Sequence, residues 1–547
     1  MPEYVPLSDP PRRRRRDVGD VEIFAPLKAI AIADGIIFEA ELGGANSGWT
    51  DLTADVDLGA EPIGIEYGIR GGGPLDRVAS VGTMAWAMNN SARNSGGLLG
   101  YYTPGHTNAR SGWEIGIAVR LKVTYNEITY YKFRGTLVAV EPDAGTSRRR
   151  SVACLAHDWM AEAMNTFVRD TAVQTSQRSD QILSTLVTNS ARRQPPAESY
   201  ETGQSTFAIA LDNLRDERTT LLRAIADVVA AEVGYFYVKG DTVQGGTARF
   251  EDRHARPKTA SSATFTNSMF SFVASRSRAA IYNHINVVTH PRTVDAAATT
   301  VLYSLTDTDS TPAIAHGETL PLTVFFRDAT GQFARVGGDD VVTPVANTDY
   351  IANSQADGGG SDLTSDLTIV FSFTSNTATL SITNDHASST AYLTTLQVRG
   401  KAVKDRYEVS VFKHDADSEE ANGERDITYD MVFEDRVEFA LGVADWFLAL
   451  YGDIRTIPSA HTIKADTSAA LKLQALAREP GDKITVTEDM TGISAKTYFI
   501  NGVQMTINPG DLIEVSWVLA PADQSQAWIL EDAVAGVLET STYLGFV

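Results

Sequence analysis

The chain has 547 residues, 43% of them hydrophobic, and a formal net charge of −22 at pH 7. This length predicts several domains with cores of their own, and the acidic excess argues against a protein that coats duplex nucleic acid, because such binding depends on Lys and Arg at phosphates. No apolar run of about 18 residues occurs, which argues against a transmembrane helix, and the first residues lack the apolar segment of a secretory signal.

Residues 1–16 predict an extended arm. Prolines precede a run of five arginines, Arg12 to Arg16, whose like charges repel one another. Two interpretations are open: a solvated arm, or a segment that docks on an acidic neighbour or on nucleic acid.

Residues 17–153 predict a first domain of antiparallel strands. Apolar segments with strand composition alternate with Gly, Pro, Asn and Asp, and no stretch of crossover-helix length separates them. The expected strands are 29–42, 62–69, 82–90, 117–125 and 128–140, and a further strand over 150–160 runs into a short helix.

Residues 154–256 predict a small α+β domain. A helix over 179–189 begins with a Ser-Asp cap, and the clearest helix of the chain is expected over 207–234, with Gly234 as its C-terminal cap. A hairpin over 234–252 follows. The two apolar helix faces consist of Ile182, Leu183, Leu186 and Val187, and of Leu211, Leu214, Leu221, Leu222, Ile225, Val228 and Val229.

Residues 257–299 predict connecting strands, and residues 300–402 an inserted β-sandwich. The segment 365–385 alternates as a hairpin does, with a turn at Ser375-Asn376, and 319–328 and 391–400 supply further strands. A Cys…Trp…Cys pattern is missing, which argues against an antibody-type domain.

Residues 403–547 predict a second β-rich domain. A strand over 406–414 and an amphipathic stretch over 433–452 come first, and 471–492 follows. From Thr497 to Asp523 apolar and polar side chains alternate on either side of a Pro-Gly pair, which predicts a regular hairpin.

Two motifs suggest chemistry at first sight. The segment GIRGGGP, from Gly68 to Pro74, lacks both the following helix and the Lys-Ser/Thr pair of a phosphate loop, so we favour a flexible loop between strands. Cys154 and His157, with Asp158 beside them, lie in an apolar strand, whereas a nucleophile and its base usually come from distant segments. A buried thiol and a structural histidine are expected, and a single cysteine is typical of a reducing cytoplasm.

The run Asp415-x-Asp417-x-Glu419 has the start of a calcium loop. Its sixth position is Glu420, where such a loop needs Gly, so a solvated acidic turn is favoured. No HExxH motif is present and no carboxylate pair is marked by its context. We therefore assign no catalytic, cofactor-binding or metal-binding residue and expect no enzyme.

Both ends of the chain resemble the tail-hub, or tail-tip, proteins of tailed bacteriophages. The pattern FLALYGDIR at 447–455 and, near the amino terminus, residues 65–91 and 130–142 share in this resemblance, which covers about 300 residues. In the carboxy-terminal part the matching positions are Gly481-Asp482, Ile484, Val486, Tyr498 to Ile500, Gly502-Val503, Pro509-Gly510, Trp517 and Leu519-x-Pro521.

The resemblance implies two tail-tube-like β-barrels per chain, so that a homotrimer presents six units to a sixfold tube. It also implies a location in the virion tail. The implied partners are tail-tube and distal tail proteins, a tape-measure protein, tail-fibre or tip proteins, and phage DNA that passes without specific binding. From loop placement we expect ring contacts at Gly71, Gly72, Gly73 and Pro74, and at Asn508, Pro509, Gly510 and Asp511.

Two other functions stay open. The chain is alternatively a receptor-binding tail protein whose 300–402 sandwich binds host-surface glycans, or a tail-associated hydrolase, which would need a carboxylate pair or a metal site. The aromatic residues Trp86, Trp517 and Phe499 are expected in cores rather than at subunit interfaces.

Overall fold

The computed structural model describes residues 35–44, 47–144, 149–168, 171–212, 219–305, 311–327 and 336–522, and two short strands, β31 (Gln526–Ala527) and β32 (Thr542–Tyr543). Within these ranges the chain is mainly β, and none of its sheets is closed. The predicted mainly β class is therefore confirmed. The arm at 1–16, Leu214 and most of the residues after 522 lie outside the described residues.

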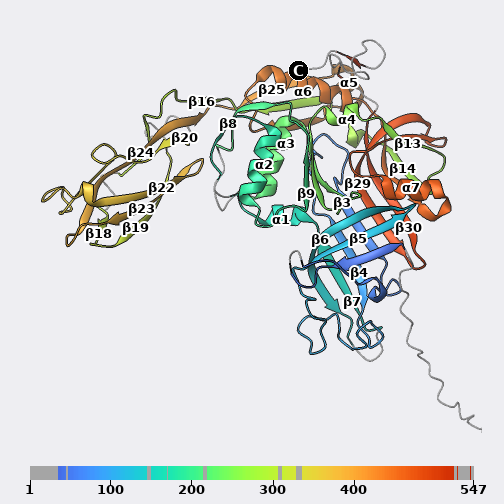
Figure 1. Ribbon diagram of the computed structural model, residues 1–547. Helices are drawn as coiled ribbons and strands as arrows, with labels where there is room; N and C mark the ends of the chain where they lie inside the picture. The colour runs from blue at the N-terminus through green and yellow to red at the C-terminus, as the bar shows by residue number, and fades with distance from the viewer. Residues whose placement is uncertain are drawn as a thin grey trace, which may run out of the picture.

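One 13-stranded sheet joins segments from both ends of the chain (Figure 1). The joint is the antiparallel pair β3–β29, in which Ile63 faces Ile507 and Gly68 faces Gly502. The two predicted barrels are thus two halves of one open sheet. In path order the strands are β14 (Ser271–Arg276), β27 (Thr456–Lys464), β30 (Leu512–Pro521), β29 (Ile493–Asn508), β3 (Ile63–Gly68), β4 (Thr83–Asn89), β7 (Ser151–His157), β6 (Ile128–Pro142), β5 (Ala118–Tyr125), β1 (Ile36–Ala40) and β2 (Thr50–Asp51), with β28 (Lys483–Glu488) beside β29 and β13 (Ser261–Thr266) beside β28.

The C-terminal half curls because one segment spans its two outer strands. The chain over 261–276 pairs first with β28, as β13, and after a bend pairs with β27, as β14. The N-terminal half returns on itself in a similar way, since Leu52 donates to Phe38 of β1 and Val56 bridges to Met88 of β4. The apolar sides of both halves form one continuous core, which contains Trp86 and Trp517. The expectation that these two tryptophans are core residues is confirmed.

The helical unit packs α1 (Trp159–Asn165), α2 (Ser179–Ser190) and α3 (Leu221–Glu232) around an apolar cluster. The predicted face of α2 is buried, but Ser179 is not its cap, because its hydroxyl donates to Glu232 over 2.8 Å. The helix predicted over 207–234 is wrong in its first half. Residues 206–210 form strand β10, Leu211 has a φ of 62°, and Val233 rather than Gly234 takes the left-handed position after α3.

Short sheets complete this unit. The hairpin predicted over 234–252 is confirmed by the antiparallel pair of β11 (Tyr235–Lys239) and β12 (Thr247–Glu251). Strand β9 (Ala197–Tyr200) pairs in parallel with β12, and β8 (Gln174–Arg178) pairs with β10 (Thr206–Ala210). The four-residue helix α4 (Ala255–Lys258) leads on to β13.

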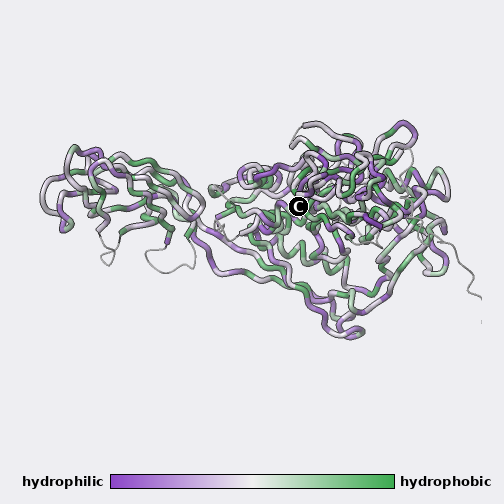
Figure 2. Tube along the Cα trace, turned by 90° about the horizontal axis from the view of Figure 1, so that it is seen from below, coloured by the Kyte–Doolittle hydropathy of each residue, from purple (hydrophilic) through white to green (hydrophobic). Residues whose placement is uncertain are grey.

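The segment around residues 300–402 forms two sheets over a separate apolar core and projects from one side of the molecule (Figures 1 and 2). The predicted hairpin is present, since Ile369 faces Ile382 and Phe371 faces Leu380. One sheet consists of β19 (Thr319–Phe325), β23 (Thr377–Asn384) and β22 (Leu367–Phe373). In the other, β16 (Arg292–Val294), β17 (Thr300–Ser304), β18 (Ala313–Ile314), β20 (Val336–Val342) and β21 (Tyr350–Asn353) all pair with β24 (Ala391–Asp405).

A further three-stranded sheet lies where the projecting unit joins the body. Helix α6 (Val437–Tyr451) contacts the strands of this sheet and buries Phe439, Val443 and Phe447. Helices α5 (Ala416–Asn422) and α7 (Ala469–Ala477) are shorter. The strands of this sheet are, in order, β25 (Val409–His414), β15 (His284–Thr289) and β26 (Asp426–Met431).

Candidate assembly surface

The glycine-rich loop after β3 is held in place on several sides. Its Gly73 amide donates to Asp76 Oδ2 over 2.8 Å, Asn501 Nδ2 donates to the Gly71 carbonyl over 2.5 Å, and the Tyr451 hydroxyl donates to the Gly72 carbonyl over 3.4 Å. The loop lies between β3 and β4, as expected, and these contacts come from three different parts of the chain. Asn501 lies on β29 and Tyr451 at the end of α6, so the sequence could not show that these partners are near.

Two buried arginines tie this loop to the body. Arg77 donates from Nε to the Pro74 carbonyl over 3.0 Å and from Nη1 to the Val233 carbonyl over 2.8 Å. Its guanidinium carbon lies 4.9 Å from the ring centre of Tyr235. Arg256 approaches the same ring to 3.6 Å and donates to Asn501 Oδ1 over 2.7 Å. Both side chains are anchored by aromatic rings and polar partners, and they connect the loop to the helical unit and to β29.

The charge of Arg256 is balanced inside the protein. Its Nε lies 2.7 Å from Glu251 Oε2, and both side chains are buried. Burial by itself lowers the pKa of Arg256, but the carboxylate of Glu251 and the neighbouring tyrosines outweigh burial and raise that pKa above its ordinary value. The guanidinium therefore stays charged and keeps the hydrogen bond to Asn501 that positions the loop.

A pocket of about 280 Å³ lies beside the loop. Its lining is largely apolar, with Arg70 among its lining residues. Gly72 is required here by close approach, because a Cβ at this position would lie 2.9 Å from the Leu519 carbonyl oxygen. The apolar and aromatic part of the lining consists mainly of Tyr282, Tyr451, Ile457, Pro458, Val518 and Leu519.

The second expected contact loop, Asn508 to Asp511, lies at the other end of the same strands. Gly510 and Asp511 have φ angles of 84° and 60° in the turn between β29 and β30, and Leu512 beside them is 54% exposed. Because β3 and β29 are antiparallel, this turn lies next to Ile63, whereas the glycine loop follows Gly68. The structure therefore separates the two loops by roughly 17 Å of strand.

A buried ion pair links the two sheet halves to the helical unit. Lys132 of β6 pairs with Glu479 and also donates to the Leu476 carbonyl over 3.1 Å. Glu479 Oε2 accepts from the Tyr67 hydroxyl over 2.8 Å and from the Gly240 amide over 3.0 Å. The sequence did not predict this group, since nothing in the local pattern relates residues 132 and 479.

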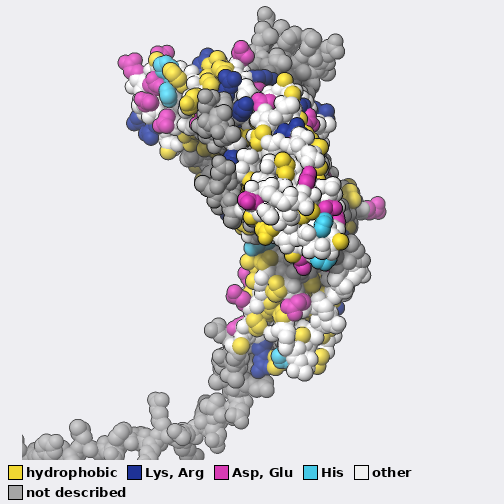
Figure 3. Space-filling model, turned by 90° about the vertical axis from the view of Figure 1, so that its left-hand side faces the viewer, with side chains coloured by type: hydrophobic (Ala, Val, Ile, Leu, Met, Phe, Trp, Pro, Cys, Tyr) yellow, Lys and Arg dark blue, Asp and Glu magenta, His cyan; other side chains and the backbone are white. Residues whose placement is uncertain are grey.

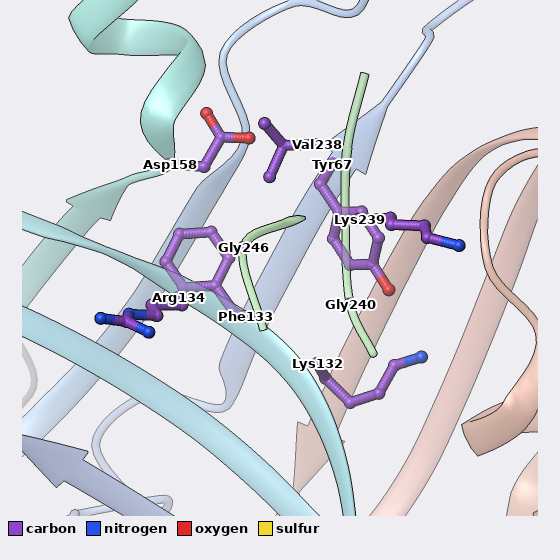
Figure 4. Close-up of a pocket in the computed structure, with 9 residues that line it drawn as sticks. All are labelled: Tyr67, Lys132, Phe133, Arg134, Asp158, Val238, Lys239, Gly240 and Gly246. Atoms are coloured by element: carbon purple, nitrogen blue, oxygen red, sulfur yellow. The ribbon is translucent and has the colours of Figure 1, made fainter. Parts of the chain in front are cut away.

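Asp158 lines a small cavity of about 10 Å³, together with Tyr67 and Lys132 (Figure 4). Its Oδ1 caps α1 by accepting from the Met160 amide over 3.0 Å, while Oδ2 has no hydrogen-bond partner among the described residues. Burial raises the pKa of Asp158 to about 7. Cys154 is buried on the preceding strand, and burial raises the pKa of its thiol well above the ordinary value. The expectation of a buried thiol is confirmed.

The acidic run at 415–419 forms a helix cap. Asp415 Oδ1 accepts from the amides of Asp417 and Ser418 over 3.1 and 3.0 Å at the start of α5. Glu419 Oε2 lies 3.1 Å from His414 Nδ1. In the part of the chain that the structure describes, no group of three or more His, Cys, Asp or Glu side chains is arranged to hold a metal ion, and no helix is long and apolar enough to cross a membrane.

Solved structures with a similar course of the chain include phage tail proteins. A 43 kDa tail protein of prophage MuSo2 from Shewanella oneidensis matches with 10% identity and a TM-score of 0.45, over 89% of this chain and 99% of its own. A tail protein from Neisseria meningitidis matches with 8% identity and the same TM-score, over 89% and 96%. A type VI secretion component of E. coli matches with 8% identity and a TM-score of 0.36, over 85% and 73%.

No family model and no curated protein matches this chain. At these identities and TM-scores the likeness carries no conclusion about function.

Proposed function

We propose that this chain is a structural protein of a phage tail. In this proposal it is a hub at the distal end of the tail tube, where it surrounds the DNA channel and connects the tube to tip or receptor-binding components. Three copies form a ring, so that six sheet halves meet the sixfold order of the tube. The mechanism is mechanical and electrostatic, and no bond is made or broken.

The pairing of β3 with β29 is the observation that carries this proposal. It places two curled half-sheets side by side within one chain, as a ring of three copies with six units requires. The residues of the sequence resemblance lie in the same two halves, for instance Gly502-Val503 on β29 and the strand after Ile65 on β3. The resemblance and the fold thus coincide at the joint.

The free ends of the large sheet support assembly. Its path ends at β14 and at β2, and no further strand pairs with their outer sides among the described residues. On and beside β14, Val273 and Phe270 are 51% and 60% exposed. An unpaired edge with exposed apolar residues is a liability in a monomer, and in a ring it is covered by the neighbouring copy.

The charge and the two loops fit the same arrangement. A net charge of −22 lets DNA slide through a channel without adhering to its wall. The Gly71–Pro74 loop and the Asn508–Asp511 turn lie at opposite ends of β3, so in the proposed ring they contact components on opposite sides.

Negative-stain imaging and mass photometry of the purified full chain test the proposal. We expect threefold rings with a central pore. Val273→Lys should abolish the rings because it places a charge on the β14 edge, while Val243→Lys, at a 76% exposed position away from the sheet ends, should not. Circular dichroism of both variants shows whether they are folded. A chain that stays a monomer under all conditions contradicts the proposal, and a cleared zone in a cell-wall zymogram favours the hydrolase.

A further inference from the structure

The outer face of the three-stranded sheet β19-β23-β22 carries ordered rows of hydroxyl groups. The register places residues of the three strands directly opposite one another, so each row crosses the sheet. In the first row the hydroxyls of Thr319 and Thr383 are 2.8 Å apart. The first row consists of Thr319, Thr383 and Thr368, and the second of Thr323, Thr379 and Ser372.

A mixed row lies between these two rows. It consists of Pro321, Ser381 and Val370, so two apolar side chains flank one hydroxyl, and Val370 is 67% exposed. Beyond the second hydroxyl row, Phe325 is 68% exposed at the end of β19. The opposite sides of these strands fill the core, with Leu380 fully buried, so the outer face is not needed for the packing of the unit.

None of the residues in these rows is ionisable. Charged residues make up 21% of the chain, so a set of nine residues would contain about two charged ones by average composition. Protein surfaces contain a higher share of charged residues than the chain as a whole. The nearest charged residues along the strands, Glu318, Arg327 and Asp385, follow or precede the strand ends. Of these, Asp385 accepts a hydrogen bond from the Thr368 hydroxyl over 2.6 Å, at the edge of the first row. Figure 3, which faces the projecting unit, shows mostly white and yellow side chains on its foremost surface, with several magenta ones scattered among them.

We infer that this face binds an uncharged polysaccharide. A hexose ring has hydroxyls around its rim and C–H groups on its faces, and the face offers hydroxyl donors and acceptors in two rows, with the apolar side chains of Pro321 and Val370 between them. Rows on one side of a strand are roughly 6.7 Å apart and neighbouring strands roughly 4.8 Å apart, which is the scale of a sugar ring. Phe325 supplies an aromatic surface against which a ring can stack.

Other occupants fit the face less well. A charged polymer would lose hydration at its charges and find no opposite charge on these strands. A stable protein interface usually has buried Trp, Tyr or Arg anchors, none of which occurs in the rows. Of these classes of ligand, an uncharged and hydroxyl-rich one best matches the hydroxyl groups and apolar side chains of this face.

Affinity electrophoresis of the full chain tests the inference. Native gels contain one of three uncharged polysaccharides, dextran, yeast mannan or a neutral galactan, or the anionic polymer hyaluronan. We expect retardation by at least one of the three and none by hyaluronan. Thr379→Lys, in the centre of the face, and Phe325→Ala should each abolish the retardation.

The matched control is Thr395→Lys. Thr395 is an exposed threonine on β24, in the other sheet of the same unit, and this variant should be retarded like the unchanged chain. The inference is overturned if no neutral polysaccharide retards the chain, or if Thr379→Lys leaves the retardation unchanged. A change of oligomeric state in Thr379→Lys without any polysaccharide effect also overturns it and identifies the face as a protein interface. Ring formation is measured separately, so failure of the hub proposal is distinguishable from failure of this one.

Discussion

The two halves of the large sheet differ in the chemistry of their interiors. Each encloses one fully buried tryptophan, Trp86 in the N-terminal half and Trp517 in the C-terminal half. Trp86 has Phe38 beside it, with ring centres 4.9 Å apart, whereas Trp517 lies 5.3 Å from the ring of the buried His461. The same kind of curled half-sheet thus forms with a phenyl ring or with an imidazole beside its buried tryptophan. Strand pairing therefore sets the shape of each half, while single residues set its response to protons.

The junction between the halves should give the largest effect. Glu479→Ala leaves the Lys132 ammonium buried without its carboxylate, which costs about 3–5 kcal/mol of unfolding free energy. Urea unfolding followed by tryptophan fluorescence measures this, and both halves should unfold in one transition. The double variant Lys132→Met/Glu479→Leu should recover most of the loss, because it removes both charges. A loss below about 1 kcal/mol would contradict a junction role.

At the boundary of the N-terminal half, Asp158 should make stability fall as pH rises. Burial raises its pKa from 3.8 to about 7, so between these pH values the folded state holds a proton that the unfolded state has released. The stabilisation is complete below pH 4 and is lost through pH 7, on the order of 4 kcal/mol. Asp158→Asn keeps the cap on α1 and should gain stability relative to the unchanged chain over this range.

The control for this variant is Asp415→Asn, which changes the same kind of cap on the partly exposed start of α5. It measures the effect of exchanging a capping carboxylate for an amide at a helix start that is not fully buried. Chemical unfolding of both variants and of the unchanged chain at several pH values measures these differences. Equal pH profiles for Asp158→Asn and the unchanged chain would show that Asp158 keeps its ordinary ionisation.

In the C-terminal half, His461 should act in the opposite direction. Neither ring nitrogen has a hydrogen-bond partner within the described residues, and burial lowers the pKa from 6.5 to about 4. The unfolded chain takes up a proton below pH 6.5 and the folded chain does not, so stability is lost as pH falls towards 4, by about 3 kcal/mol. His461→Phe should remove this loss, and His316→Phe, at an exposed position, should not.

Excision of the projecting unit should have the smallest effect on the two halves. Val294 and Val403 face each other across β16 and β24, so an Asn-Gly turn can join them in place of residues 295–402. The core of the unit is separate from that of the large sheet, and we expect the unfolding free energy of the body to change by less than about 1 kcal/mol. Rings should persist and polysaccharide binding should be lost. Loss of the rings would show that the unit takes part in assembly.

Local patterns in the sequence were enough to predict most strands. The hairpin around Pro509-Gly510 and the one at Ser375-Asn376 follow from alternation and turn residues, and both are present. The helix predicted over 207–234 failed because strand β10 has the same apolar composition as helix α3, and the reversal that begins at Leu211 leaves no mark in that composition. Propensity does not record where a chain reverses.

The joint and the polar groups around it could not be predicted. The sequences of β3 and β29 have the pattern of ordinary half-buried strands, and neither sequence identifies the other strand as its partner. The contacts of the glycine loop could not be predicted because its partners, Asn501 and Tyr451, are distant in sequence. Buried charges such as Lys132 cannot be distinguished from surface lysines without the tertiary contacts that neutralise them.

The pairing of β3 with β29 can form only after nearly the whole chain has been synthesised. More than 400 residues separate the two strands, and at ribosomal speeds the second emerges roughly 20–90 s after the first. Throughout that interval β3 has an open border in the nascent polypeptide. Premature association between the products of neighbouring ribosomes is therefore a hazard during this interval, and slower translation of the middle of the gene lengthens the interval.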